Sequence, residues 1–232
     1  MYGSKSMNTQ SVTSILFEQD DVESSLRQLG LTKSKLEDAL MWGVQERLNC
    51  GPLLPTTFPG AAQWAYTIEG FRHQVGADGW TVESHQNLPV TIAPDESFAI
   101  VVYTGDKDTG LRHGHPTNKA KKGLKAQQAV LRNTKSGELF PETLQPQQEP
   151  AKNVLKTWVL LYHLDATNPK QPVLRSELSL PSKFDQKLGK ILDWEIRIIL
   201  DEIDLSDDPE IVKTYVDEPE IPLDIPVRRK TA

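Results

Sequence analysis

A polar loop follows the continuously apolar stretch 100–102 and holds residue types that could bind a metal ion. Asp106, Asp108, His113 and His115 all fall within ten consecutive positions. Carboxylate and imidazole groups are common ligands of the metal ions that activate water for phosphoester hydrolysis. Alternate residues of an extended chain point to opposite sides, so both histidines would reach one ion only if the loop curls around it. These four residues give one hypothesis, a metal-dependent phosphoesterase or nuclease.

The same region is basic within a chain that is acidic as a whole. Positions 105–135 contain eight basic and two acidic side chains, a local charge of +6, whereas the full chain has a formal charge of −6. Glycines let backbone N–H groups approach an anion and lysines supply positive charge, so this pattern favours phosphate as the ligand. The spacing of a nucleotide-binding P-loop is missing. The candidate phosphate contacts are Lys107, Arg112, Lys119, Lys121, Lys122 and Lys125.

A solvated loop without any ligand is the third interpretation of these residues. In that case the aspartates cap turns, the histidines have no special role, and the lysines keep the surface soluble. The three interpretations require different conformations of the loop. Its conformation depends on the helices and strands that surround it.

The composition limits the class of protein. With 38% hydrophobic and 25% charged residues in a chain of 232, a soluble globular protein with a sizeable core is expected. No apolar run approaches the ~20 residues of a membrane helix, and the first residues lack the apolar core of a secretory signal. Cys50 is the single cysteine and cannot form an internal disulfide, so a cytoplasmic location is expected.

Two short amphipathic helices are predicted on either side of Gly30, and the segment 22–40 has the outline of a helix-turn-helix. A DNA-reading second helix should present basic and amide side chains, yet Lys33 and Lys35 are followed by acidic residues. A plain helical corner and a DNA-binding motif are both compatible with this pattern. A third helix is predicted over 59–74, where apolar residues recur at steps of three and four.

Short strands are predicted in the middle of the chain, and three amphipathic runs follow at 156–164, 173–180 and 191–200. The continuous apolar stretch 100–102 predicts a central strand that is covered on both sides. The three later runs predict an antiparallel sheet with one wet face. The expected fold is therefore α+β, with N-terminal helices, a mixed middle region and an antiparallel C-terminal sheet.

Charged residues alternate with apolar ones along the last two of these runs. Asp193, Glu195 and Arg197 fall on the side opposite the apolar residues of the third run. Arg175 and Glu177 share one side of the second run, so cross-strand ion pairs are expected on the wet face. Such pairs would be structural rather than catalytic.

The chain divides into a flexible tail at 1–14, one α+β domain at 15–200 and an acidic, proline-rich tail at 201–232. The proline- and glutamine-rich segment 134–152 is a possible boundary inside the domain. Between positions 201 and 224 there are ten acids and one lysine, a charge of −9, and the prolines there oppose a long helix. This tail is a candidate contact for a protein partner.

Several motifs together resemble a family of uncharacterised bacterial proteins, over roughly residues 58–230. The resemblance implies a bacterial source but no activity, and no functional residue can be transferred from it. The motifs are Leu88-Pro89-Val90-Thr91, Thr104-Gly105-Asp106, Val173-Leu174-Arg175-Ser176-Glu177-Leu178-Ser179-Leu180-Pro181, Trp194-Glu195-Ile196-Arg197-Ile198 and Asp224-Ile225-Pro226-Val227.

The sequence favours a non-catalytic binding or assembly subunit of the bacterial cytoplasm. Its basic region 105–135 would contact phosphate groups of nucleic acid or of a nucleotide. The metal-dependent phosphoesterase and the DNA-binding helix-turn-helix at 22–40 are the alternatives. The sequence leaves the cofactor unknown, and a membrane partner is not expected.

Overall fold

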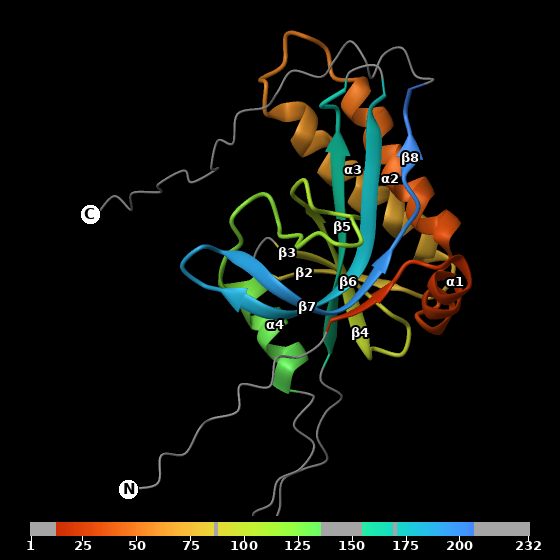
Figure 1. The fold of residues 1–232 in the computed structure, drawn as a ribbon, viewed down its shortest axis with the longest axis vertical. Coiled ribbons are helices and arrows are strands. Elements are labelled where there is room, and N and C mark those ends of the chain that lie inside the picture. Colours follow the sequence, from red (N-terminus) through yellow and green to blue (C-terminus); the bar gives the residue numbers. More distant parts are fainter. Residues whose placement is uncertain (1–12, 86–87, 136–154, 169–170, 207–232) are drawn as a thin grey trace, which may run out of the picture.

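A mixed β-sheet forms the centre of the molecule (Figure 1). The computed structural model describes residues 13–85, 88–135, 155–168 and 171–206. In these ranges the strand order is β1-β7-β6-β5-β4-β3-β2, and β8 pairs with β6. The strands are β1 Ser14–Leu16, β2 Thr81–His85, β3 Leu88–Ile92, β4 Phe98–Thr104, β5 Lys156–Asp165, β6 Val173–Asp185, β7 Lys190–Ile199 and β8 Ile203–Asp204.

The sheet joins the two halves of the chain through a parallel pair. Strands β5, β6 and β7 form the antiparallel unit predicted from the sequence. Strand β4 runs parallel to β5, with Ile100 opposite Trp158 and Val102 opposite Leu160, and β2 and β3 continue the sheet beyond it. Six consecutive residues of β4 are buried, which confirms that it is a central strand.

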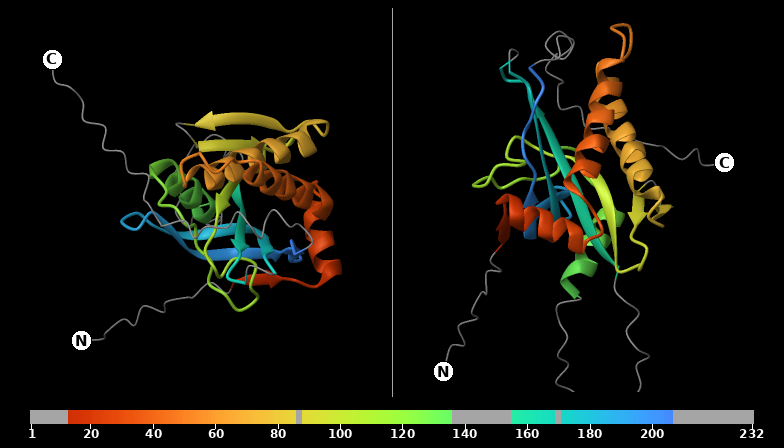
Figure 2. Two further views of the ribbon diagram at one scale, coloured as in Figure 1. Left: turned by 90° about the horizontal axis from the view of Figure 1, so that it is seen from above. Right: turned by 90° about the vertical axis from the view of Figure 1, so that its right-hand side faces the viewer.

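Two layers of helix cover the sheet (Figures 1 and 2). Helices α1 Gln19–Gln28, α2 Lys33–Leu48 and α3 Phe58–Gly76 share a core with one face, which includes Phe71, Ile100 and Leu160. Helix α4 Leu124–Lys135 packs on the other face against Val101 and Leu161. The α+β class and the N-terminal placement of the helices are confirmed. None of the described helices has the length and apolar character needed to cross a membrane.

The helical corner at α1 and α2 has the outline that the sequence predicted. Leu26 and Leu36 are fully buried across the turn, where Gly30 has a φ of 67° that favours glycine. The basic residues at the start of α2 face the protein's own acids, since Lys33 bonds Asp201 and Lys35 bonds Asp78. The corner packs its apolar side chains into the core, and these two lysines are engaged within the chain.

The sheet includes residues that the sequence assigned to the tails. Ser14 begins β1, which pairs in parallel with β7, and Ile203 pairs with Leu174 through β8. Strands on both sides of the segment 136–154 belong to the same sheet. The rest of both tails, and positions 136–152 of the candidate boundary segment, lie outside the described residues.

Helices α2 and α3 approach so closely that a glycine is needed between them. A Cβ atom at Gly43 would lie 2.1 Å from the Thr67 Oγ1 atom and 2.6 Å from the Gln63 carbonyl oxygen. We expect Gly43→Ala to lower the free energy of unfolding by about 1–3 kcal/mol because the helices must separate. Urea denaturation would measure this, with Gly76→Ala as the control, since nothing lies within 4 Å of a Cβ there. Equal stability of the two variants would contradict the close packing.

Candidate functional site

A buried ion pair lies beneath the polar loop that follows β4. The Glu177 carboxylate accepts hydrogen bonds from Arg197 Nε at 3.1 Å and Arg197 Nη2 at 2.5 Å. The two side chains are 0% and 2% exposed. These two residues do form a cross-strand ion pair, as the sequence predicted, but the pair is buried rather than on a wet face. The loop covers this side of the sheet and excludes water from it.

The ion pair holds the loop through its backbone. Arg197 donates to the carbonyl oxygens of Gly114 at 2.8 Å and Leu111 at 3.1 Å, and the N–H of Gly110 donates to Glu177 at 3.0 Å. Ser179 Oγ also donates to the Glu177 carboxylate at 2.9 Å. Because every partner of the pair is inside the protein, these charges fix the loop and are not available to a substrate.

The four predicted metal ligands do not converge on one point. Asp106 accepts from the backbone N–H groups of Asp108 and Thr117 at 3.2 and 3.3 Å, and Asp108 accepts from the N–H of His115 at 3.3 Å. His113 and His115 are exposed. Within the described ranges no three histidine, cysteine or acidic side chains are placed to share an ion. The aspartates shape the loop as turn-capping groups.

Asn118 joins the end of the loop to the turn between β6 and β7. Its buried side chain donates to the carbonyl oxygens of Ala120 at 2.7 Å and Gly189 at 2.9 Å, and accepts from the Ile191 N–H at 2.8 Å. Lys122 adds a backbone hydrogen bond to Gly189 at 2.9 Å. Sequence analysis missed Asn118, because its partners lie about seventy positions further along the chain.

Three of the six predicted phosphate contacts, Lys119, Lys121 and Lys122, lie beside this turn, and a fourth, Lys125, follows shortly after them in the sequence. Lys190 from β7 joins them, since its Nζ donates to the carbonyl oxygens of Asn118 and Lys119 at 2.5 and 2.6 Å. The side chain of Lys121 passes close to Gly189, and Lys125 follows in the first turn of α4. We call this group the lysine surface. It consists of Lys119, Lys121, Lys122, Lys125 and Lys190.

The other two predicted phosphate contacts lie apart from the lysine surface. The guanidinium of Arg112 stacks over the Phe17 ring, with its carbon 3.7 Å from the ring centroid. The backbone carbonyl of Lys107 accepts from Arg175 at 3.1 Å, which holds that part of the loop against β6. The structure thus brings together the basic residues after position 118 and separates those before it.

Lys122 is the unusual member of the group. It is half-buried, and its Nζ lies 4.1 Å from the centroid of the Tyr103 ring. Burial, and secondarily the positive charge of Lys190, lower the pKa of Lys122 to about 8. A lysine in this setting carries its charge at neutral pH and loses it in mildly alkaline solution.

The lowered pKa gives a direct test of this geometry. In a side-chain NMR titration, one lysine should lose its proton near pH 8, and that signal should disappear in Lys122→Arg. Lys190→Met should raise the midpoint because a neighbouring positive charge is removed. The folded form binds fewer protons than the unfolded form between pH 8 and 10.5, so this residue adds stability as pH rises through that window. A Lys122 midpoint at the ordinary value would contradict its burial.

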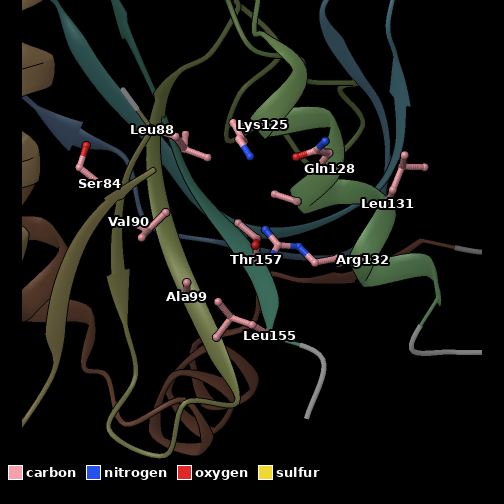
Figure 3. A pocket seen from close by; sticks show the side chains of 11 residues that line it. Ser84, Leu88, Val90, Ala99, Lys125, Gln128, Leu131, Arg132, Leu155 and Thr157 are labelled. Carbon is pink, nitrogen blue, oxygen red and sulfur yellow. The ribbon is translucent and has the colours of Figure 1, made fainter. Parts of the chain in front are cut away.

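An open groove of about 700 Å³ borders the lysine surface (Figure 3). Helix α4 forms one wall, and strands β2 and β3 form the opposite wall, with β4 and β5 between them. Lys125 and Arg132 line the α4 wall, and Figure 3 shows Arg132 extended toward Thr157. The groove is lined by Ser84, Leu88, Val90, Ala99, Lys125, Gln128, Ala129, Leu131, Arg132, Leu155 and Thr157.

Comparison with known proteins identifies no relative of this chain. No family model, no curated protein and no solved structure matches it. The resemblance to uncharacterised bacterial proteins therefore stays a prediction from the sequence.

Proposed function

We propose that the protein is a non-catalytic binding subunit that contacts phosphate groups of nucleic acid or of a nucleotide through the lysine surface. The observation that carries this proposal is the gathering of five lysines where the loop, the β6–β7 turn and α4 meet. Lysines act as point charges toward phosphate, and several on one surface can follow a phosphate backbone.

The charges of the lysine surface are not neutralised by the protein itself. In the part of the chain that the structure describes, none of the five lysines forms an ion pair with an acid. Asp185 faces Lys190 across the β6–β7 hairpin, and its carboxylate accepts the backbone N–H groups of Lys187 and Leu188. The surface therefore presents net positive charge, which would attract a polyanion to an otherwise acidic molecule.

The backbone beneath the lysines is fixed, and this supports binding over simple solvation. Asn118 and Lys190 hold the loop end to the β6–β7 turn, and Tyr103 supports Lys122 from below. A preorganised set of charges loses less conformational entropy on binding than a mobile one. We therefore propose binding rather than catalysis.

We include a cytoplasmic location in the proposal. Cys50 is the one cysteine of the sequence, and its thiol donates to the Glu46 carbonyl oxygen at 3.3 Å. A thiol kept as a hydrogen-bond donor to the last turn of α2 suits a reducing compartment.

Charge reversal on the lysine surface tests the proposal. We expect Lys119→Glu/Lys121→Glu/Lys125→Glu to weaken binding of a labelled single-stranded oligonucleotide by at least about tenfold, equally for unrelated sequences, because phosphate contacts carry no sequence information. Fluorescence anisotropy at fixed, low ionic strength would measure the dissociation constant. Lys122 and Lys190 are left unchanged because they also contact the fold.

A charge-matched control separates a local site from overall charge. Arg27→Glu/Lys107→Glu/Arg112→Glu alters the formal charge by the same amount, at residues that form no ion pair among the described residues and lie apart from the lysine surface. This control should retain nearly the affinity of the unchanged protein. Equal losses in the two triple variants would mean that net charge, rather than the lysine surface, governs binding. Nucleotides added as competitors would show whether a single nucleotide suffices.

A further inference from the structure

The groove beside α4 has two chemically different walls. Lys125, Gln128 and Arg132 stand at helical spacing along α4 and present a polar, positively charged wall. Leu88 and Val90 of β3 form an apolar wall opposite. Figure 3 shows the two sets of side chains directed into the same space. A long ligand that fits this groove needs one acidic side and one apolar side.

One stretch of this chain has that pattern in its sequence. From position 218 to 227, apolar residues occupy every odd position and acids occupy three of the five even ones. This stretch lies outside the described residues. In an extended chain, alternate residues point to opposite sides, so the pattern specifies an acidic side and an apolar side. The acids are Glu218, Glu220 and Asp224, and the apolar residues are Pro219, Ile221, Leu223, Ile225 and Val227.

We propose that residues 218–227 of the same chain occupy the groove, with their acids toward α4 and their apolar side chains toward β3. Complementary charge is the first support, because Lys125 and Arg132 have no acidic partner among the described residues. The apolar row is the second, because it would cover the exposed parts of Leu88 and Leu131.

The spacing of the charges agrees on the two sides. Seven residues of helix separate Lys125 from Arg132, which is ~10.5 Å along α4 at the helical rise. Four residues of extended chain separate Glu220 from Asp224, which is ~13 Å. Both carboxylates can therefore meet a cation at once. The prolines of the segment lack N–H groups and suit an extended chain that lies in a groove without joining the sheet.

The segment is long enough to reach the groove from the end of the described chain. Strand β8 pairs with Val173, which faces Asp165 at the far end of β5 from Thr157. Eight residues of strand between Asp165 and Thr157 span ~26 Å. The residues from 206 to 218 can span ~40 Å when extended. The connection needs no movement of the sheet.

Docking of this segment would regulate the lysine surface. Lys125 belongs to both the groove and the lysine surface, so a docked acid and a bound phosphate would compete for it. This regulatory consequence rests on the proposed function, whereas the docking itself does not. The tail would then act as an internal mimic of the anionic ligand.

Carbodiimide cross-linking of the full chain tests the docking, because this reagent joins only amines and carboxylates in direct contact. Peptide mapping by mass spectrometry should find Lys125, and to a lesser extent Lys121, joined to Glu220 or Asp224. An equal mixture of unlabelled and ¹⁵N-labelled protein distinguishes links within one chain from links between two copies. We expect links within one chain.

Two matched variants test the role of the apolar row. Ile221→Ser/Leu223→Ser/Ile225→Ser keeps every acid and should reduce the yield of these links by about tenfold, since burial of apolar area would be lost. Ile211→Ser/Val212→Ser/Val216→Ser alters the same tail outside the alternating stretch and should leave the yield unchanged.

Four outcomes would overturn the proposal: links between two copies, links from Lys125 to Glu138 or Glu142 instead, equal linking of the tail to Lys33, or full yield in the first serine variant. Oligonucleotide binding is measured in parallel. Links in the unchanged protein, with no oligonucleotide binding even by the Ile221→Ser/Leu223→Ser/Ile225→Ser variant, would contradict the proposed function alone, and binding without links would contradict the docking alone.

Discussion

Glu177→Ala is expected to lower the free energy of unfolding by about 3–5 kcal/mol, the largest effect that we expect from a single substitution. The substitution leaves the Arg197 guanidinium buried without its carboxylate, and it removes the acceptor for the Gly110 N–H. Urea denaturation would measure the loss. Glu195→Ala, at an exposed position on the neighbouring strand, should change stability by less than about 0.5 kcal/mol.

A double variant separates the energy of the pair from its effect on the loop. Glu177→Leu/Arg197→Met removes both charges together and should be less destabilised than Glu177→Ala, because no unpaired charge stays buried. Amide hydrogen exchange at positions 110–114 should still increase, since the loop loses its anchors. A cost for Glu177→Ala no larger than for Glu195→Ala would show that water reaches the pair and that the loop does not seal it.

Asn118→Ala is expected to cost about 2–4 kcal/mol, since it leaves the buried Ile191 N–H without a partner and removes the side-chain hydrogen bonds to the Ala120 and Gly189 carbonyl oxygens. Oligonucleotide affinity should fall as well, because the lysines on either side lose their fixed backbone. Asn49→Ala, at an exposed helix end, is the control and should have a small effect. Calorimetric melting and anisotropy would measure the two losses. A stable Asn118→Ala with normal affinity would contradict the role given to the loop end.

Local sequence patterns were sufficient to predict most of the elements. The helices predicted on either side of Gly30 and over 59–74 correspond to α1, α2 and α3. The three amphipathic runs correspond to β5, β6 and β7, because strand alternation and turn residues are local properties of the chain. Strand β1 was missed, since three residues at the sheet edge carry too little periodicity.

The direction of the side chains on β7 could not be predicted. The sequence placed Trp194 with Ile198 on one face and Arg197 on the other, wet face. In the structure, register shifts near Pro181 change the alternation, so Trp194 lies in the core under α4 and Ile198 in the core under α2 and α3. Arg197 is buried because the loop covers it, and a covering loop leaves no periodic signal on the strand beneath.

The candidate site could be predicted only in part, because some of its residues are close in the sequence and others are distant. Lys119, Lys121 and Lys122 are close in sequence and stay close in space, as the cluster of charges indicated. Lys190 and Asn118 join the site through contacts across about seventy positions, which a single sequence cannot show. His113 and His115, the pair predicted as metal ligands, are exposed. The Asp108 carboxylate accepts a hydrogen bond from the backbone N–H of His115 and so shapes the loop.

Salt dependence of oligonucleotide binding tests the central claim most directly. With four or five phosphate contacts to a single strand, the logarithm of the association constant should fall against the logarithm of salt concentration with a slope of about −3. The triple variant Lys119→Glu/Lys121→Glu/Lys125→Glu keeps only one or two of these contacts and should bind with a slope of about −1 or not bind. Absence of binding by the unchanged protein at low salt, or a slope that the triple variant shares, would contradict the account.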